Sequence, residues 1–245
     1  MIGLLLWRGI LMTRIFLQED QTISKEDRHH LFHVLRMKAG DSLEAVYQGE
    51  VFQAFLKENS QVDGELDLKE KIQGEEKSYQ IYLLQGLPKG QKWEAILEHG
   101  TEVGIDVFIP LQMTRSLRKV NHKWQKLQDR WTKILEKAAK QSKQTRIPKV
   151  EKPCPLQEAL RTLPSDTLIL ACYEEEKISK MKDYVHGEEK NIALIIGPEG
   201  GLDPEEIQEI KNFGGKTVTL GRNILRTETA PLVAADRIYC LMEEG

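Results

Sequence analysis

Short apolar runs alternate with helical patterns over residues 81–242, and this alternation is the strongest constraint on the fold. The runs suit buried strands and lie at 81–84, 107–110, 167–172, 192–196 and 217–220. Helical periodicity fills most of the intervals and follows the last run, at 91–103, 122–141, 156–163, 204–213 and 229–242. This order predicts an α/β layer fold with a mostly parallel sheet, whose ligands should bind at the carboxyl ends of the strands.

The preceding residues have a different pattern, of short strands with one helix. Ser24, followed by the acidic residue Asp27, predicts a helix over 24–36 with an apolar face made by Leu31, Val34 and Leu35. Strands are predicted at 43–47, 51–57 and 65–68, and a polar linker at 71–77. We therefore predict a small β-rich domain over 13–72 and a larger α/β domain over 73–245.

Residues 1–12 carry no motif of the domain that follows. They are mostly apolar, but Arg8 interrupts them, no basic segment precedes them and no small-residue cleavage site follows them. These features disfavour a secretory signal peptide. We interpret 1–12 as an extension upstream of a domain that begins at Thr13.

Composition excludes several classes of protein. No apolar run reaches the roughly 18 residues of a membrane span. The 3 Cys lie at 154, 172 and 240, an odd number without a CxxC pair. They predict a reducing, cytoplasmic setting rather than a disulfide scaffold or a zinc site, and we expect no bound metal.

Charge is distributed unevenly along a chain whose net charge is −3. Residues 112–152 contain 13 Lys and Arg against 3 acidic residues, a local charge of +10 that leaves −13 for the remainder. A concentrated basic segment in an otherwise acidic protein is typical of a surface that binds a polyanion.

The predicted helix 122–141 has an apolar face and a basic face. At about 100° per residue, each kind of residue falls within its own arc of the helix. The apolar arc holds Trp124, Leu127, Trp131, Ile134, Leu135 and Ala138, and the basic arc holds Lys123, Lys126, Arg130, Lys133, Lys137 and Lys140. The basic face is either solvated or in contact with phosphates, and the scarcity of acidic residues favours the phosphates of RNA.

Two polar loops each follow a predicted strand and precede a helix. Gly197-Pro198-Glu199-Gly200-Gly201 follows the run 192–196, and Asp203-Pro204 then marks a helix start. The second loop, 220–231, places two Arg, one Glu and two Thr before the last helix. Glycines at a strand end let the backbone approach a ligand closely, although a tight turn alone would explain one or two of them. The loops predict a site at one edge of the sheet and leave its ligand open.

At these loops the sequence resembles a known family. Residues 196–202 (IGPEGGL) and 220–231 (LGRNILRTETAP) are similar to the cofactor loops of the SPOUT methyltransferases, and more closely to those of the RsmE type, the 16S rRNA (uracil-N3)-methyltransferases. The likeness extends to segments such as His29-His30-Leu31, Glu102-Val103-Gly104 and 138–142, so that it covers 13–242. GPEGG alone is shared across the superfamily, whereas the ordered set is specific to this type.

The resemblance implies a fold, a cofactor and an assembly. The expected fold is an N-terminal PUA-like β-barrel and a C-terminal α/β domain with a deep trefoil knot. The cofactor is S-adenosyl-L-methionine (AdoMet), and the partner is 16S rRNA or the small ribosomal subunit. A homodimer is also implied, and helix 229–242 favours it because apolar residues cover more than one of its faces. We expect a cytoplasmic location and no membrane association.

The resemblance also assigns binding residues. It implies AdoMet contacts at Cys172, Gly197, Glu199, Gly200, Gly201, Leu220, Gly221, Ile224, Leu225 and Thr229. The candidate RNA contacts are Arg14, Arg28, Arg36, Arg115, Lys126, Arg130, Lys133 and Lys137.

Methylation of uridine N3 by a sulfonium requires alignment and loss of the N3 proton, but neither a metal nor a covalent enzyme intermediate. Arg226 and Arg222 are candidates to stabilise negative charge on the uracil oxygens. Glu199 and Glu228 are candidates to accept the proton, and each is equally a candidate to cap backbone N–H groups of its own loop.

Other functions remain open. One is ribose 2′-O methylation within the same superfamily, which the N-terminal and middle segments disfavour. Another is a non-catalytic RNA-binding protein, which the intact GPEGG and RTET segments disfavour. A small-molecule methyltransferase would leave the basic segment without a role.

Overall fold

The computed structural model describes residues 13–72, 77–116 and 124–243. The chain separates into two units, residues 1–76 with 143–146 and residues 77–142 with 147–245. The extension 1–12 and the predicted domain boundary after residue 72 both lie at or outside the limits of the described residues, as do three basic residues of the charged segment, Arg118, Lys119 and Lys123.

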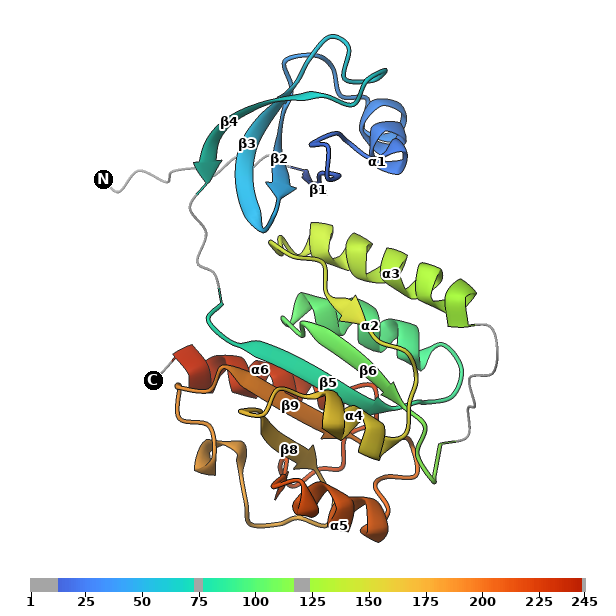
Figure 1. Ribbon diagram of the computed structural model, residues 1–245, viewed down its shortest axis with the longest axis vertical. Helices are drawn as coiled ribbons and strands as arrows, with labels where there is room; N and C mark the ends of the chain where they lie inside the picture. Colours follow the sequence, from blue (N-terminus) through green and yellow to red (C-terminus); the bar gives the residue numbers. More distant parts are fainter. Residues whose placement is uncertain (1–12, 73–76, 117–123, 244–245) are drawn as a thin grey trace, which may run out of the picture. The chain divides into compact units, whose positions relative to one another are not determined.

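The first unit is a four-stranded sheet with one short helix (Figure 1). Its strands are β1 (Arg14–Phe16), β2 (Ser42–Tyr47), β3 (Glu50–Leu56) and β4 (Leu66–Ile72), in the order β1-β2-β3-β4. β1 is parallel to β2, and the other pairs are antiparallel. Alternate strand residues point to a small core with the helix residue Leu31, which is fully buried.

The helix of the first unit differs from its prediction. α1 (Lys25–His29) begins at the predicted Ser24 cap, but continues as a π-helical turn, η1 (His30–Val34). The wider turn, in which the Leu35 N–H donates to the His30 carbonyl, shifts the side chains relative to an α-helical face. Val34 and Leu35 are therefore 58% and 43% exposed, and the prediction that they share one apolar face with the buried Leu31 is wrong.

β4 runs four residues beyond its predicted end at 68, and the predicted linker 71–77 begins too early. The extra residues, 69–72, are exposed and mostly charged. An edge strand with solvent on both faces carries no alternation of apolar and polar residues, so periodicity does not reveal it.

Residues 143–146 belong with the first unit rather than with the second domain, where the prediction placed them. Glu44 of β2 accepts from Arg14 Nε at 2.8 Å and from Lys143 Nζ at 2.9 Å. Arg14 also donates to the backbone carbonyls of Lys143 and Gln144. Partial burial acts to raise the pKa of Glu44, but the hydrogen bonds from Lys143 and Arg14 outweigh it and lower that pKa.

The second unit is built on a six-stranded sheet in which every pair of neighbours is parallel, as predicted. Its strands are β5 (Gln80–Gly86), β6 (Val107–Leu111), β7 (Lys149–Val150), β8 (Leu168–Cys172), β9 (Asn191–Ile196) and β10 (Lys216–Val218). The order is β10-β8-β9-β5-β6-β7. After β7, at one edge of the sheet, the chain therefore crosses to the other side of β5, where β8, β9 and β10 lie.

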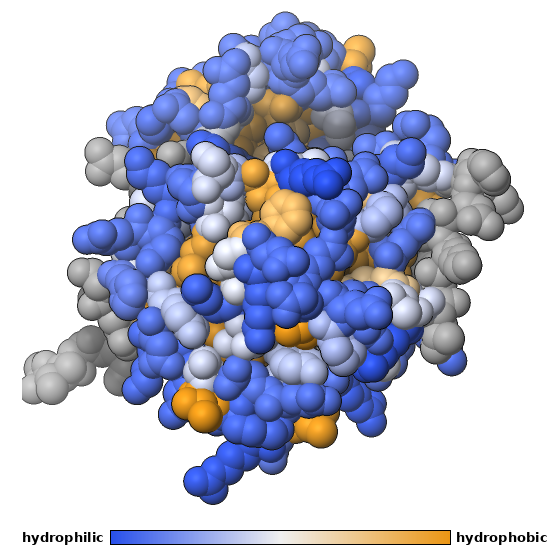
Figure 2. Space-filling view, turned by 60° about the horizontal axis from the view of Figure 1, so that its bottom comes forward, coloured by the Kyte–Doolittle hydropathy of each residue, from blue (hydrophilic) through white to orange (hydrophobic). Residues whose placement is uncertain are grey.

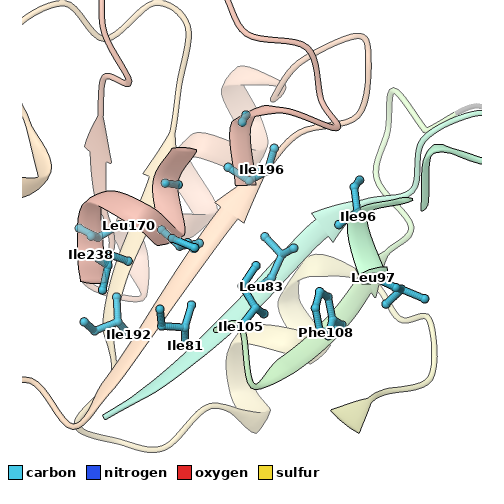
Figure 3. Close-up of a cluster of buried hydrophobic side chains, with 14 of the residues drawn as sticks. Ile81, Leu83, Ile96, Leu97, Ile105, Phe108, Leu170, Ile192, Ile196 and Ile238 are labelled. Atoms are coloured by element: carbon cyan, nitrogen blue, oxygen red, sulfur yellow. The ribbon is translucent and has the colours of Figure 1, made fainter. Parts of the chain in front are cut away.

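Helices cover both faces of this sheet (Figure 1). α2 (Lys92–Glu102) and α6 (Ala230–Glu243) pack on one face, with α3 (Trp124–Gln141) against α2 and the short η2 (Met181–Asp183) beside α6. α4 (Leu156–Thr162) and α5 (Pro204–Asn212) pack on the other. In Figure 3, Leu83 of β5, Ile196 of β9 and Ile96 of α2 point into the first of these two cores.

α3 is amphipathic, as predicted. Trp131, Leu135 and Ala138 are buried, and the indole of Trp131 meets that of Trp93 on α2 edge-to-face, with ring centroids 5.5 Å apart.

Polar side chains dominate the face drawn in Figure 2, where apolar residues form only small patches. Within the described residues, no helix is both long and apolar enough to span a bilayer.

We expect Gly100→Ala to destabilise the second unit, although Ala is the better helix former by about 1 kcal/mol. A Cβ at this α2 position would lie 2.8 Å from Phe108 Cε1 and 3.1 Å from Ile105 Cδ1. Overpacking against a buried ring costs about 1–3 kcal/mol, so the free energy of unfolding in urea should fall by about 1 kcal/mol.

A double-mutant cycle provides the control for this prediction. In a Phe108→Leu background the smaller side chain leaves room for the methyl group, and Gly100→Ala should then be neutral or stabilising. An equal loss in both backgrounds would show that Phe108 is not the obstacle.

Candidate functional site

Three neighbouring strands, β10, β8 and β9, end at the same edge of the parallel sheet. The segments that follow them enclose a cavity of about 500 Å³. The lining residues are 172–174, 196–201, 219–227, Lys92, Lys177 and Ala230. The two loops predicted to form a site therefore face one cavity, at the carboxyl ends of the strands.

The first loop, 197–201, folds tightly on itself. The Gly201 N–H donates to the Pro198 carbonyl at 2.9 Å, and a Cβ on Gly197 would lie 2.7 Å from the carbonyl carbon of Gly201. Gly201 has a φ of +72°, and a Cβ there would collide with the carboxylate of Glu174. Turn geometry accounts for these two glycines, and it leaves bare backbone exposed to the cavity.

A buried amide joins the two loops to the sheet. Gln85 of β5 is fully buried, and its Nε2 lies 3.0 Å from Thr227 Oγ1 and 3.2 Å from the Gly197 carbonyl. Thr227 Oγ1 in turn donates to the Gly197 carbonyl at 2.8 Å. The second loop is thus attached to the first through side chains that lie 142 residues apart in the sequence.

Arg115 holds the other side of the first loop. Its Nη1 donates to the carbonyls of Gly200 at 2.9 Å and Leu202 at 3.2 Å, and its Nη2 lies 3.4 Å from Asp203 Oδ2. A Cβ on Gly200 would point at the Arg115 side chain, 3.0 Å from its Cβ. The guanidinium of Arg115 therefore positions the loop, and because the side chain is 41% exposed, its role as an RNA contact stays a prediction.

Lys92, the first residue of α2, joins one carboxylate from each loop. Its Nζ lies 3.2 Å from Glu199 Oε1 and 3.3 Å from Glu228 Oε2. Glu199 Oε1 also accepts from the Lys89 backbone N–H at 3.0 Å. The two predicted proton acceptors are therefore close neighbours that share one ammonium group.

The second loop leads into α6. Ile224 is 83% exposed, and Arg222 and Arg226 are exposed as well. Within the described residues, the guanidinium of Arg226 has no hydrogen-bond or ion-pair partner, and Glu228 pairs with Lys92 instead. Arg226 thus presents its full donor set at the edge of the cavity, which is what recognition of a developing negative charge requires.

The third wall follows β8. Glu176 accepts from the backbone N–H groups of Ile178 at 2.9 Å and Ser179 at 3.1 Å, and from Thr217 Oγ1 of β10 at 2.8 Å. These hydrogen bonds lower the pKa of Glu176 to about 2. On the same wall, burial raises the pKa of Cys172 to about 12, so this side chain stays an uncharged thiol.

The structure brings most of the predicted cofactor residues together. Those that line the cavity are Cys172, Gly197, Glu199, Gly200, Gly201, Leu220, Gly221, Ile224 and Leu225. Thr229 is not among the lining residues, because it begins the first turn of α6, where its carbonyl accepts from the Val233 N–H. Arg226 lines the cavity. Glu228 is not among the lining residues, but it pairs with Lys92, which is one of them.

Sequence reasoning missed Gln85, Lys92, Glu174 and Lys177. Gln85 offered one signal, a polar residue at the end of an apolar strand, which is uncommon unless the side chain has a buried partner. Lys92 offered none, because a Lys at the start of a helix is usually solvated.

The predicted RNA-binding residues fall into two groups. Lys126, Arg130, Lys133 and Lys137 are exposed on α3, where Arg130 pairs with Glu94 at 2.6 Å. In the first unit Arg36 is exposed, and Arg28 donates to the Val62 carbonyl at 2.5 Å. The Arg14 side chain is only 9% exposed and is engaged by Glu44, so it is not available to RNA.

Comparison with known proteins follows the same division of the chain. The family described as "RNA methyltransferase domain" matches residues 75–239, and the "RNA methyltransferase PUA domain" matches residues 23–65. The chain belongs to the RNA methyltransferase family. The predicted fold class is confirmed, an α/β methyltransferase domain of the SPOUT class with a PUA-like N-terminal domain; the trefoil knot stays a prediction.

Relatives of this RNA methyltransferase match it over most of their length. Ribosomal RNA small subunit methyltransferase E of Bacillus subtilis is 35% identical and covers 94% of each chain. The protein of the same name from Synechocystis is 31% identical, over 97% of this chain and 78% of the relative.

Solved structures agree. Ribosomal RNA small subunit methyltransferase E from Neisseria gonorrhoeae, bound to S-adenosyl methionine, has a TM-score of 0.82 at 26% identity, over 94% of this chain and 98% of that one. A protein from Legionella pneumophila with bound SAM has a TM-score of 0.80 at 26% identity, over 94% and 97%.

We expect Glu176→Gln to lower the free energy of unfolding, because it weakens the cavity wall that follows β8. The effect should appear only at pH values at which the Glu176 carboxylate is ionised. Because the folded state lowers the pKa from 4.5 to about 2, the stabilisation is fully present above pH 4.5 and is lost as the pH falls toward 2. The group is partly exposed, so the RNA methyltransferase variant should lose only about 0.5–1 kcal/mol in urea unfolding at pH 7.

The loss should shrink between pH 4 and pH 3 and disappear near pH 2. Glu175→Gln, a change at the adjacent exposed carboxylate, is the control and should have no comparable pH-dependent effect. A loss at Glu176 that is the same at pH 7 and pH 3 would rule out the ionised carboxylate as its cause.

Proposed function

We propose that this protein transfers the methyl group of AdoMet to N3 of a specific uridine in 16S rRNA of the small ribosomal subunit. The observation that carries the proposal is the single cavity enclosed by the loops 197–201 and 219–227. Similarity over 94% of the chain to a ribosomal RNA small subunit methyltransferase E supports it. Since its substrate is rRNA, we place the activity in the cytoplasm.

The residues of the cavity fit AdoMet. Its volume of about 500 Å³ lies within the range of roughly 300–1,000 Å³ that is usual for small-molecule sites. Bare backbone at Gly197 and Gly201 suits close contact with a ligand, and Leu220 and Leu225 offer apolar surface. The carboxylates of Glu174 and Glu199 complement a cationic ligand.

AdoMet, when bound, supplies an electrophilic methyl group. The chain then has to place uridine N3 in line with that group, remove the N3 proton and stabilise the charge that develops on the uracil oxygens. Arg226 has its donors free of described partners and is placed to stabilise that charge. The two proposed proton acceptors are Glu199, which lines the same cavity, and Glu228, which pairs with the lining residue Lys92.

RNA is proposed to bind along the exposed basic face of α3, formed by Lys126, Arg130, Lys133 and Lys137. Contacts of this kind neutralise phosphates and position the RNA without reading its sequence. Arg28 and Arg36 of the first unit are proposed as further contacts. Arg14 is omitted, because its side chain is only 9% exposed and is engaged by Glu44, whereas the Arg115 side chain is 41% exposed and stays a proposed contact.

We further propose that the protein acts as a homodimer through α6. This helix buries Ala234, Ala235 and Ile238 against the sheet, while Tyr239 on another side is 46% exposed. An apolar side chain exposed on a helix already packed on one face suits a second copy.

We expect Gly201→Ala to weaken AdoMet binding by at least about tenfold, which corresponds to about 1.4 kcal/mol. The new methyl group strains a residue with a φ of +72° and displaces the Glu174 carboxylate at the cavity wall. Titration calorimetry with AdoMet measures the change.

Gly214→Ala is the matched control. Gly214 has a similar φ of +82°, but it lies after α5, outside the cavity, with nothing within 4 Å of its missing Cβ. Both variants should lose a similar stability of about 1–2 kcal/mol, and only Gly201→Ala should lose affinity. Equal affinities would place AdoMet elsewhere.

The proposed function as a whole is tested by mapping methylated nucleotides in small-subunit rRNA from cells with and without the gene. We expect one N3-methyluridine to disappear, to return with the wild-type or the Gly214→Ala protein, and to return poorly with Gly201→Ala. Loss of a ribose 2′-O-methyl group instead would identify the other activity of this fold class. No change in any nucleotide would favour a non-catalytic RNA-binding protein.

Arg226→Lys should lower kcat with little effect on AdoMet affinity, because the planar fork of donors is lost while the charge remains. Loss of one donor to a developing oxyanion costs about 10²–10³ in kcat. If Arg226 stabilises the N3 anion, the rate of the variant should recover partly at alkaline pH. Arg161→Lys, on the exposed side of α4, is the control.

A uniform loss of RNA affinity with a normal single-turnover rate at saturating RNA would instead make Arg226 a phosphate contact.

A further inference from the structure

The ammonium group of Lys92 lies between the carboxylates of Glu199 and Glu228, the two candidates to accept the N3 proton. The side chains of Lys92, Glu199 and Glu228 are 36%, 28% and 25% exposed, so each is partly shielded from water. They come from the start of α2, the first loop and the second loop. The ion pairs therefore place both carboxylates relative to each other and to the cavity that Lys92 lines.

The two carboxylates differ in how fully their oxygens are occupied. Glu199 Oε1 accepts from both the Lys89 N–H and the Lys92 ammonium. Burial acts to raise the pKa of Glu199, but hydrogen bonds from its own backbone N–H, from Lys89 and from Lys92 lower it overall. A carboxylate held in this way is a weak proton acceptor, because its donors stabilise the ionised form.

Glu228 Oε2 is in the opposite situation. It is buried, and no described residue gives it a hydrogen bond that meets the usual geometry; its charged neighbour is Lys92 at 3.3 Å. A buried polar atom without a hydrogen bond is costly and calls for an explanation, and a catalytic role of its carboxylate is one. The side chain as a whole is 25% exposed, so the carboxylate can meet a donor that enters the site while Lys92 lies beside its covered oxygen.

We propose, on the basis of the proposed function, that Glu228 accepts the uracil N3 proton and that Lys92 is the residue that positions it. Glu199 then has a structural role, as the fixed second partner of the ammonium group. The proposal chooses between two carboxylates that sequence reasoning left equivalent, and it adds a positioning residue that such reasoning did not find.

The step balances as follows. The N3–H bond breaks and its proton passes to the carboxylate of Glu228, while the electron pair left on N3 forms the new bond to the methyl carbon. The bond from that carbon to the sulfonium sulfur breaks, and its pair stays on sulfur, which becomes neutral. The proton on Glu228 leaves to water when the product departs, and the ammonium of Lys92 keeps its proton throughout.

The test compares Glu228→Gln with Glu199→Gln in single-turnover methylation of rRNA at saturating RNA and AdoMet, as a function of pH. Loss of a general base lowers the rate by about 10²–10⁴. Glu228→Gln should show such a loss near neutral pH and should recover as alkaline solvent removes the N3 proton. Glu199→Gln changes the cavity wall, so it should lose some rate, but much less than Glu228→Gln and with the wild-type pH profile. Glu188→Gln, an exposed carboxylate away from the cavity, is the control.

Further variants keep the test decisive if a change harms folding. Glu228→Asp keeps the carboxylate but withdraws it by one methylene, and should give an intermediate rate with an unchanged pH profile. Lys92→Met should lower kcat by about 10–100-fold while the AdoMet dissociation constant from calorimetry changes little, and Lys92→Arg should restore most of the rate. Lys211→Met, on the exposed side of α5, is the control for these changes.

A readout without cofactor or RNA tests the pairing itself. In the protein alone, carboxyl NMR titration should show that the pKa of Glu199 rises in Lys92→Met and not in Lys211→Met. An unchanged Glu199 titration would overturn the role of Lys92.

A Glu228→Gln enzyme with a normal rate and pH profile, or a larger loss in Glu199→Gln, would overturn the choice of base while the wild-type protein still methylates rRNA. If the wild-type protein does not methylate rRNA, the proposed function fails and the choice of base fails with it, and the NMR titration still decides the role of Lys92.

Discussion

The hydrogen bonds of the buried Gln85 amide are the interaction on which the candidate site depends. Parallel pairing brings the ends of β8, β9 and β10 to one edge of the sheet, but it does not hold the loops beyond them together. Gln85 does so from the neighbouring β5, by donating to Gly197 of one loop and Thr227 of the other. A polar group in such a core is stable only when its partners are also in place, so the strand and both loops order together.

The charged side chains at this edge of the sheet determine which ligands suit it. Acidic side chains from three segments lie on or beside the cavity, namely Glu174, Glu199 and Glu228. The cationic residues that line it include Lys92, Lys177, Arg222 and Arg226. Carboxylates suit a cationic methyl donor. Arg226, whose N–H donors are unengaged, suits the anion that the uracil becomes when it loses its N3 proton. The basic residues of α3 form a separate surface, where exposed charge favours phosphates over a buried ligand.

Several elements were predictable because their signals are local. The apolar arc of α3, the Asp203 cap of α5 and the glycines of the 197–201 loop each depend on residues within a few positions of one another. Predictions failed where the side chains of a helix or strand did not follow the regular α-helical or β-strand period. The π-helical turn moved Val34 and Leu35 to the surface, and the outer half of β4 has no apolar face to detect.

The sequence by itself determined which segments become strands and helices, and that polar loops follow the strand ends, because side-chain periodicity and turn residues act locally. Only the tertiary structure decided which side chains meet. It engaged Arg14 with Glu44, which removes Arg14 from the expected RNA contacts, and it bound Arg115 to the carbonyls of the first loop. It also brought Lys92 between Glu199 and Glu228. Such contacts join residues 30 to more than 130 positions apart, and they follow from strand order and side-chain direction, which no local pattern encodes.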